Sequence, residues 1–387
     1  MRVLIVHCRY QQRGGEDAVV DSEVDLLRSA GDQVELFERY NTEIAEMGQA
    51  SLAMQTVWSR PTRAAIKAVV ERFQPDVAHI HNTFPLISPS VYSALGDLGV
   101  PIVQTFHNFR WLCPQAMFLR EGRVCEDCLG RAPVPALIHG CYRNSRLQTA
   151  VLSAMLVVHR YAGTLAHHVS RFVALNEFCR RKFIDGGLPA HKVVVKPNFV
   201  DLPEPEVRTR KGILFVGRLS PEKGIRVLSG ACAAVPEADV RVAGEGDQAD
   251  LLAGLGNVRL LGSIDPAMVR EEMLGAECLV MPSIWYENFP RTLVEAFACG
   301  LPVIASRLGA MAELVRDGVT GLLFDPGDAS SLADRMRWAL ANPARMREMG
   351  ANARNEFETH YSADENYRML ISIYKDAIKE ARGSHAR

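Results

Sequence analysis

The chain has 387 residues, of which 48% are hydrophobic and 23% charged, with a formal net charge of −1. This length exceeds what one hydrophobic core usually serves, so two domains are expected. The balanced charge gives no sign of a nucleic-acid partner. Nine cysteines without a secretion signal indicate a reducing compartment, so we expect a cytoplasmic protein.

Short apolar runs alternate with helical patterns along the first 200 residues. Strands are expected at RVLIVH (2–7), QVELFE (33–38), DVAHIHN (76–82), VPIVQTFHN (100–108) and RFVALN (171–176). The first run is too short for a signal peptide. A glycine loop, RGGEDAVV, follows it and opens an amphipathic helix that ends at Ala30. Such alternation predicts βαβ units and a parallel sheet.

An apolar stretch, LQTAVLSAMLVV, runs from Leu147 to Val158. It is too short to cross a bilayer, which needs about 20 residues. A core helix is therefore expected. The alternative is a helix that touches a membrane surface, because Arg143, Arg146 and Arg160 flank the stretch.

A second domain is expected after a break. Three prolines and mixed charge between Pro197 and Lys211 predict a linker. Strand-like runs then restart at GILFVG (212–217), DVRVAG (239–244), VRLLG (258–262), CLVMPS (278–283) and PVIAS (302–306). The sequence thus predicts an α/β chain of two Rossmann-like, doubly wound domains, residues 1–200 and 201–362, with an interdomain cleft. A terminal amphipathic helix follows over residues 363–387.

Two basic residues follow the strand expected at 212–217, in the motif VGRLSPEKG. Arg218 and Lys223 stand where the chain turns from a strand into a helix. Backbone N–H groups at a helix start attract phosphate, and arginine adds bidentate hydrogen bonds. The motif therefore predicts an anion site, with a solvated turn as the alternative. A second turn, VAGEGDQ, holds Gly244, where glycine permits either close approach to a ligand or a plain tight turn.

Two glutamates flank a helix start in the stretch YENFPRTLVEAFACGLPVIAS. Pro290 suits the first turn of that helix, and free amides from Phe289 to Leu293 favour an anion such as a diphosphate. Glu295 lies one turn further in, placed to accept hydrogen bonds from ribose hydroxyls. Glu287 lies nearer the cleft and suits the hydroxyls of a sugar.

The Glu-x7-Glu spacing, preceded by GRLSPEKG and followed by EAFACGLPVIAS and VRDGVTGLLFDPGD, closely resembles the retaining glycosyltransferases of family 4, of the bacterial polysaccharide-biosynthesis type. The resemblance implies a GT-B fold whose C-terminal helix packs back on the first domain. GGE, QTFHNFR and KPNFVD in the first half also fit. ENFP stands where many relatives have Glu-Gly-Phe-Gly, which leaves the identity of the donor sugar open.

The resemblance implies a role for each matching residue. Arg218 and Lys223 would clamp the diphosphate of a nucleotide sugar, Glu295 would hold the ribose, and Glu287 the donor sugar. His107, in TFHN, would lie near the transferring sugar, while Gly14 and Gly15 would let the first-domain loop close over the phosphates. The predicted catalytic set is His107, Glu287, Arg218 and Lys223. The predicted donor-binding set is Gly14, Gly15, Arg218, Lys223, Gly244, Glu287, Asn288, Phe289, Pro290, Leu293 and Glu295.

The family retains the anomeric configuration by same-face attack, in which the leaving phosphate takes the acceptor proton. The resemblance therefore calls for no protein nucleophile, although Glu287 as a covalent nucleophile is the alternative. Because the sequence has no Asp-x-Asp motif, we expect no catalytic metal. The cations would instead stabilise the departing diphosphate.

A cysteine-rich insert occupies residues 113–141, directly after HNFRW. Its C-x11-C-x2-C-x12-C spacing suits structural Zn²⁺, bound by Cys113, Cys125, Cys128 and Cys141, with His139 as an alternative to the last. An iron–sulfur cluster would use the same ligands, and free cysteines are the remaining alternative. The insert is expected to shape the acceptor site.

His79 and His81 alternate onto one face of a strand. Packed or hydrogen-bonded histidines are expected there, with a metal-binding pair as the alternative.

The sequence therefore predicts a hexosyltransferase that moves a sugar from a UDP- or GDP-linked donor to a glycan. The expected acceptor is a glycan or a lipid-linked glycan. For a lipid-linked acceptor, we expect the protein to contact the inner face of the cell membrane peripherally. A nucleotide-sugar epimerase or phosphorylase of the same fold is one alternative. A non-catalytic nucleotide- or partner-binding protein is the other.

Overall fold

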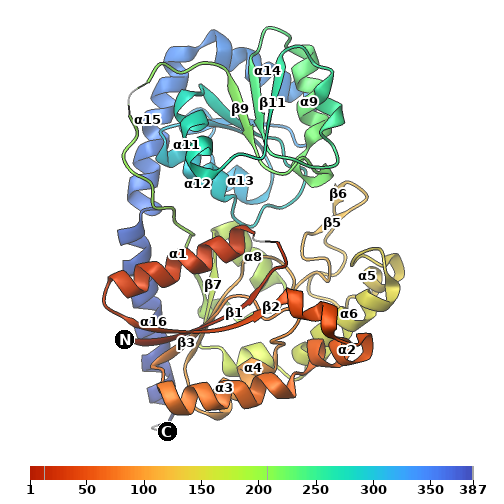
Figure 1. Cartoon of the computed structure of the whole chain (residues 1–387), viewed down its shortest axis with the longest axis vertical. Helices are drawn as coiled ribbons and strands as arrows, with labels where there is room; N and C mark the ends of the chain where they lie inside the picture. The colour runs from red at the N-terminus through yellow and green to blue at the C-terminus, as the bar shows by residue number, and fades with distance from the viewer. Residues whose placement is uncertain (13, 207, 386–387) are drawn as a thin grey trace. The chain divides into compact units, whose positions relative to one another are not determined.

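A computed structural model describes residues 1–12, 14–206 and 208–385. The chain divides into two compact units (Figure 1). The first unit comprises Met1–Met117, Glu126–Asn198 and Asn366–Arg387, and the second comprises Phe118–Cys125 and Phe199–Glu365. Each unit contains a six-stranded sheet whose strands all pair in parallel, so the predicted pair of Rossmann-like α/β halves is confirmed.

The sheet of the first unit has the strand order β2-β1-β3-β4-β7-β8. Its strands are β1 (Arg2–Arg9), β2 (Gln33–Tyr40), β3 (Val77–Ile80), β4 (Ile102–Thr105), β7 (Arg171–Ala174) and β8 (Val193–Val195). Its helices are α1 (Gly15–Ser29), α2 (Gln49–Val57), α3 (Arg60–Phe73), α4 (Ser90–Asp97), α5 (Val134–His139), α6 (Arg146–Tyr161), α7 (Thr164–His168) and α8 (Glu177–Asp185), with short 3₁₀ turns at Asn41–Glu46 and Ala190–Lys192.

The sheet of the second unit has the order β11-β10-β9-β12-β13-β14. Its strands are β9 (Ile213–Val216), β10 (Val240–Ala243), β11 (Val258–Gly262), β12 (Cys278–Met281), β13 (Val303–Ser306) and β14 (Gly321–Phe324). Its helices are α9 (Ile225–Ala234), α10 (Asp250–Ala253), α11 (Pro266–Gly275), α12 (Arg291–Ala298), α13 (Gly309–Leu314), α14 (Ala329–Ala341) and α15 (Pro343–His360), with a 3₁₀ turn at Pro221–Lys223.

Helix α16 (Ala363–His385) contributes to the core of the first unit. Leu370, Tyr374 and Ala377 are buried against β1 residues such as Val3 and Ile5. The same core takes one face of α1, where Val20, Val24 and Leu27 recur at helical spacing. Residues far apart in sequence therefore build one hydrophobic core.

Four short strands lie outside the sequence expectations. Strand β8 directly precedes the predicted linker, in a run that was given no strand, and β14 lies in a stretch used only as a motif. The cysteine-rich insert contains an antiparallel hairpin of β5 (Leu119–Arg120) and β6 (Arg123–Val124). Strands β5, β6 and β8 have only two or three residues, too few for a periodic pattern to show.

The apolar stretch expected as a core helix forms most of α6, and only one face of it is buried. Leu152, Met155 and Leu156 are buried, whereas Leu147 is 72% and Tyr161 93% exposed. Within the part of the chain that the structure describes, no helix has the length and hydrophobicity needed to cross a bilayer.

Candidate functional site

The strand order of each sheet marks where a ligand is expected to bind. In the second unit the order reverses between β9 and β12, and loops at the carboxyl ends of such neighbouring strands form the ligand crevice of open α/β sheets. Lys223 follows β9 and Glu287 follows β12. The corresponding point in the first unit lies between β1 and β3, whose loops carry Gly14 and His81.

Lys223 and Glu287 form a close ion pair at the edge of the second sheet. The ammonium Nζ donates to Oε1 of the carboxylate at 2.7 Å. The hydroxyl of Ser283 and the indole N–H of Trp285 donate to the same oxygen at 2.8 Å and 3.0 Å. The Lys223 ammonium also lies 5.6 Å from the centre of the Trp285 ring. One carboxylate oxygen thus holds three donors in a fixed arrangement.

The electrostatics of this pair keep the carboxylate charged. Burial alone would raise the pKa of Glu287, but the Lys223 charge and the donated hydrogen bonds outweigh it and lower the pKa below its ordinary value. The side chain of Lys223 remains 22% exposed. The site therefore offers a fixed cation that a ligand can approach.

The other predicted cations and carboxylates of this edge are also paired. Arg218 donates to Glu222 at 3.1 Å, with a side chain 72% exposed. Arg291 donates to Glu295 at 2.9 Å, one turn apart on α12. Glu295 therefore already has a cationic partner that the sequence did not point to.

Helix α12 begins one residue later than expected. Pro290 occupies the N-cap position, outside the first turn where we placed it. The amide of Leu293 donates to the carbonyl of Pro290 at 3.0 Å, so it is not one of the free amides predicted for an anion. Asn288 is buried and Leu293 fully so, while the ring of Phe289 packs edge-on against Tyr361.

Gly244 is required by the packing of two loops. Its φ is +141°, and a Cβ added there would lie 1.9 Å from the carbonyl oxygen of Gly217. The loops after β9 and β10 therefore touch through their backbones, which only glycine permits. The structure thus shows a tight turn against the neighbouring loop at Gly244, and its role toward a ligand stays a prediction.

In the first unit, a carboxylate anchors the glycine loop. The amide of Gly14 donates to Asp17 at 2.9 Å, and Asp17 contacts Nε2 of His7 at 2.8 Å. Burial would raise the pKa of Asp17, but these contacts lower it. A Cβ at Gly14 or Gly15 would meet no atom within 4 Å, so the loop has room on the outside of the helix start.

His107 lies just after β4 and lines a cavity in the first unit. Its Nε2 lies 2.9 Å from Nδ1 of His81, and the two rings stack. Burial, then the neighbouring histidines, lower the pKa of His107 well below its ordinary value, so the ring is neutral. Other residues lining the cavity are Asn82, Thr83, Phe84, Gln104, Asn108, Arg110 and Trp111.

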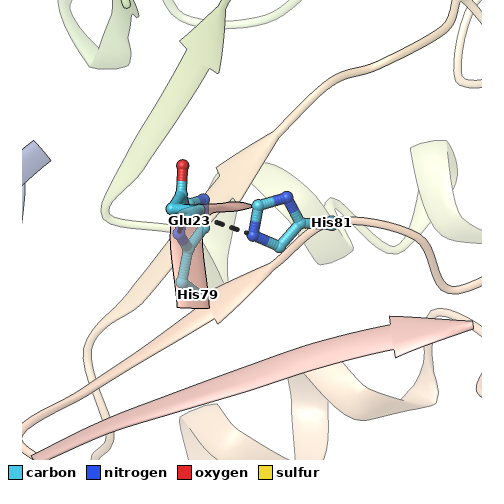
Figure 2. A group of neighbouring side chains, drawn as sticks. All are labelled: Glu23, His79 and His81. Atoms are coloured by element: carbon cyan, nitrogen blue, oxygen red, sulfur yellow. Dashed lines mark ion pairs between the residues drawn. The ribbon is translucent and has the colours of Figure 1, made fainter. Parts of the chain in front are cut away.

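His79 and His81 are buried and hydrogen-bonded, as the sequence favoured, but their main partner was missed. Glu23, on the buried face of α1, contacts both of them (Figure 2). A glutamate at a core position of an amphipathic helix was the signal for a buried polar partner.

The cysteines of the insert remain a predicted metal site: Cys113 and Cys128 are buried, and Cys125 and Cys141 partly exposed.

Two family models match the chain. Residues 14–204 match the model described as Glycosyltransferase Family 4, and residues 202–356 match Glycosyl transferases group 1. Phosphatidyl-myo-inositol mannosyltransferase of Mycobacterium leprae is 38% identical over 184 residues, covering 44% of this chain and 49% of that protein. D-inositol 3-phosphate glycosyltransferase 1 of Catenulispora acidiphila is 28% identical over 342 residues, covering 80% and 74%. The chain spans about half the length of several of these curated relatives.

Solved structures share the fold. Anabaena Alr3699/HepE in complex with UDP superposes with a TM-score of 0.68 at 18% identity, covering 96% of this chain and 99% of that one. Sucrose-phosphate synthase from Thermosynechococcus elongatus superposes with a TM-score of 0.72 at 18% identity, covering 98% and 99%. At this identity the likeness shows the GT-B fold.

Proposed function

Because the chain belongs to glycosyltransferase family 4, we propose that it transfers a hexose from a UDP- or GDP-linked donor to a glycan or lipid-linked glycan, with retention of the anomeric configuration. The relatives are mannosyl- and inositol-phosphate glycosyltransferases, and one structural neighbour holds UDP. The product would serve polysaccharide biosynthesis in the cytoplasm.

The observation that carries this proposal is the Lys223–Glu287 pair at the switch point of the second sheet. A diphosphate bound at this edge would meet the Lys223 ammonium, already oriented by a buried carboxylate. Preorganised cations lower the energy of a transition state in which negative charge grows on the leaving group. Arg218, mostly exposed and paired with Glu222, supplies a second cation.

The hydrogen bonds of each residue support a separate role for it in the proposed reaction. Lys223 and Arg218 neutralise the diphosphate as the bond to the sugar breaks. Oε1 of Glu287 is occupied by three donors, so it orients Lys223, and its second oxygen is assigned to a donor-sugar hydroxyl. Glu295 accepts from the ribose hydroxyls beside Arg291. In this scheme the leaving phosphate, and no protein carboxylate, receives the acceptor proton.

Nucleotide binding tests the proposal. A thermal-shift screen of the wild type against UDP, GDP, ADP, CMP and dTDP should show one nucleotide that stabilises the protein, by about 2.7 kcal/mol at a hundred times its Kd. The same nucleotide should then shift Arg218→Ala and Glu295→Ala less. Arg345→Ala is the matched control, because Arg345 is an exposed arginine paired within α15.

The sugar form of that nucleotide should then be consumed with transfer to an added glycan. Release of a changed but untransferred nucleotide sugar would favour an epimerase. No stabilisation by any nucleotide would contradict the transferase and favour a partner-binding protein.

We also propose that α5 and α6 contact an anionic membrane surface that presents the acceptor. Leu147, Val158 and Tyr161 are exposed at helical spacing along α6, and Val134 and Ile138 are exposed on α5. Exposed apolar side chains beside Arg143 and Arg146 suit the interface of anionic lipids. Arg160 has a different role, because it donates to the carbonyls of Arg131 and Trp111 at 2.6 Å and 2.8 Å.

Vesicle flotation tests the membrane contact. The wild type should float with phosphatidylglycerol vesicles and remain below with phosphatidylcholine vesicles. Leu147→Gln with Tyr161→Ser should abolish flotation, whereas Met268→Gln, an exposed apolar residue of the second unit, should not. Equal flotation of both variants would refute the assignment.

A structural zinc ion in the insert is the last part of the proposal. It is supported by the spacing of the four cysteines and by the burial of Cys113 and Cys128. The purified protein should contain one zinc per chain, and Cys125→Ser should lose it. Cys232→Ala, at a buried cysteine of the second unit, is the control. A zinc-free protein of full stability would refute the site.

A further inference from the structure

A line of buried polar groups connects α1 to His107 inside the first unit. Oε1 of Glu23 lies 2.8 Å from Nδ1 of His79 and 3.4 Å from Nε2 of His81. Figure 2 shows the carboxylate of Glu23 beside the two rings, and His81 extends away from it. The other nitrogen of His81, Nδ1, lies 2.9 Å from Nε2 of His107. The line thus runs from Glu23 through His81 to His107.

Several contacts fix the carboxylate of Glu23. The ammonium of Lys196 donates to Oε2 at 3.1 Å and to the side-chain oxygen of Asn366 at 2.9 Å. Burial alone would raise the pKa of Glu23, but the charges of Lys196 and His79 lower it well below its ordinary value. Glu23 is therefore an anion, and an anionic carboxylate only accepts hydrogen bonds.

The proton on His81 can be assigned from this. Burial, then the neighbouring His79, lower the pKa of His81 to about 3, so its ring is neutral and carries one N–H. Among the described residues neither Nε2 of His81 nor Oε1 of Glu23 makes a well-aligned hydrogen bond, and an unpaired buried donor is costly. The carboxylate oxygen is an acceptor within reach of Nε2. The N–H of His81 is therefore on Nε2, and its Nδ1 carries a lone pair.

That lone pair determines the state of His107. The ring of His107 is neutral, and its Nε2 faces Nδ1 of His81. Nε2 of His107 must then carry the proton and donate it, which leaves the lone pair of His107 on Nδ1. No partner of that nitrogen occurs within the described chain, and the residue lines the cavity.

We propose that Glu23 is a positioning residue that, through His81, fixes the tautomer of His107 so that its Nδ1 accepts a hydrogen bond from a ligand hydroxyl in the cavity. If the protein is the transferase proposed above, that hydroxyl belongs to the sugar; the tautomer itself does not depend on the reaction. Glu23 acts from inside the core without touching a ligand.

Three of the same atoms also lie close enough together to hold a metal ion: Oε1 of Glu23, Nδ1 of His79 and Nε2 of His81 lie within 4.8 Å of one another. A metal would bind the lone pair of Nε2 of His81. The proton of His81 would then be on Nδ1, and that of His107 would move from Nε2 to Nδ1. Lys196 already neutralises the carboxylate, and the hydroxyl of Tyr374 lies 2.7 Å from Nδ1 of His79. The hydrogen-bonded arrangement is therefore the one these contacts favour.

Long-range ¹H–¹⁵N correlation of the histidine rings in the wild type measures the tautomers directly. His107→Asn and His81→Gln identify the signals by their loss. We expect His107 protonated on Nε2 and His81 protonated on Nε2. The opposite tautomer of either ring, or metal-bound nitrogen shifts with metal in the purified protein, would overturn the proposal even if nucleotide binding is as expected.

Glu23→Gln should reverse the direction of each hydrogen bond from residue 23 through His81 to His107. Lys196 only donates, so the amide oxygen of the new side chain must stay on its side, and the NH₂ group must face His81. His81 then moves its proton to Nδ1, and His107 moves its own to Nδ1. Tyr374→Phe is the matched control, because it removes a fully buried hydroxyl next to His79 without touching the line. It should leave His107 unchanged.

Kinetics distinguish positioning from stability. With the sugar nucleotide identified by the screen, kcat/KM in Glu23→Gln should fall about tenfold, the size of one lost hydrogen bond. In a His107→Asn background, Glu23→Gln should cause no further loss. An equal loss in both backgrounds would show that Glu23 acts through the fold alone and would overturn the proposal.

Discussion

The carboxyl edges of the two sheets carry different kinds of polar contact. In the second unit Lys223, Arg218 and Arg291 form ion pairs that are partly open to water. In the first unit, Glu23 and Lys196 form an ion pair that is almost wholly buried, with the rings of His79 and His81 beside the carboxylate. Partly exposed cations can exchange a carboxylate for a phosphate. A buried pair cannot exchange without leaving a charge unpaired, so it holds geometry instead of binding.

The largest effect is expected from breaking the buried pair. Lys196→Met leaves the anion of Glu23 in the core and should destabilise the first unit by about 3–5 kcal/mol. Hydrogen exchange of the β1 and β3 amides measures this loss in that unit. Lys182→Met, which breaks a partly exposed pair with Glu126, should cost under about 1 kcal/mol. Equal losses would contradict the contrast between the edges.

Removing the cation at the other edge should affect binding more than folding. Lys223→Met should weaken binding of the nucleotide diphosphate by about 1.5–3 kcal/mol, because a hydrogen bond to a charged group is lost. Titration calorimetry measures the change. Lys211→Met, at the amino-terminal end of β9, is the control and should bind normally. Unchanged binding in Lys223→Met would place the diphosphate elsewhere.

Acid should distinguish the two carboxylates. The pKa of Glu287 is lowered and that of Glu23 is lowered further, from an ordinary value of about 4.3. Each therefore adds stability above that value and loses it as the pH falls through its folded-state pKa. Glu287 should protonate first, as followed by carboxyl ¹³C shifts, with Glu287→Gln and Glu23→Gln for assignment. The reverse order would show that the first-unit pair is the weaker one.

The smallest effect on stability is expected at Arg218. Its pair with Glu222 is exposed, so Arg218→Ala should change the free energy of unfolding by less than about 0.5 kcal/mol. Urea denaturation of the second unit measures this. A loss above 1 kcal/mol would mean that Arg218 serves the fold, and its proposed role toward the diphosphate would then need another residue.

The sequence predicted more of the site at the carboxyl edge of the second sheet than of the site at the first. At the second edge, Arg218 and Lys223 are five residues apart and Glu287 follows the adjacent buried strand, so strand ends alone indicated an anion site. Its fine structure was missed: Trp285 and Ser283 hold Glu287, and Arg291 holds Glu295. These partners lie within a turn of residues already singled out, and only side-chain directions reveal them.

At the first edge, His107 came from the family resemblance, and the residues that hold it were not predicted. Glu23, Lys196 and Asn366 lie up to 343 positions apart, yet they meet at one point. No periodic pattern links such distant residues. The available signal was chemical: Glu23 sits among Val20, Val24 and Leu27 on the buried face of α1, and a charge in that position needs a partner.

The place of α16 in the first core has a consequence for synthesis on the ribosome. The second unit is complete once Glu365 has been made, whereas the first still lacks Leu370, Tyr374 and the Asn366 that binds Lys196. Domains generally fold as units as the chain emerges. The first unit can therefore complete its core only after α16 has been made, so its folding depends on residues that follow the whole of the second unit in the chain.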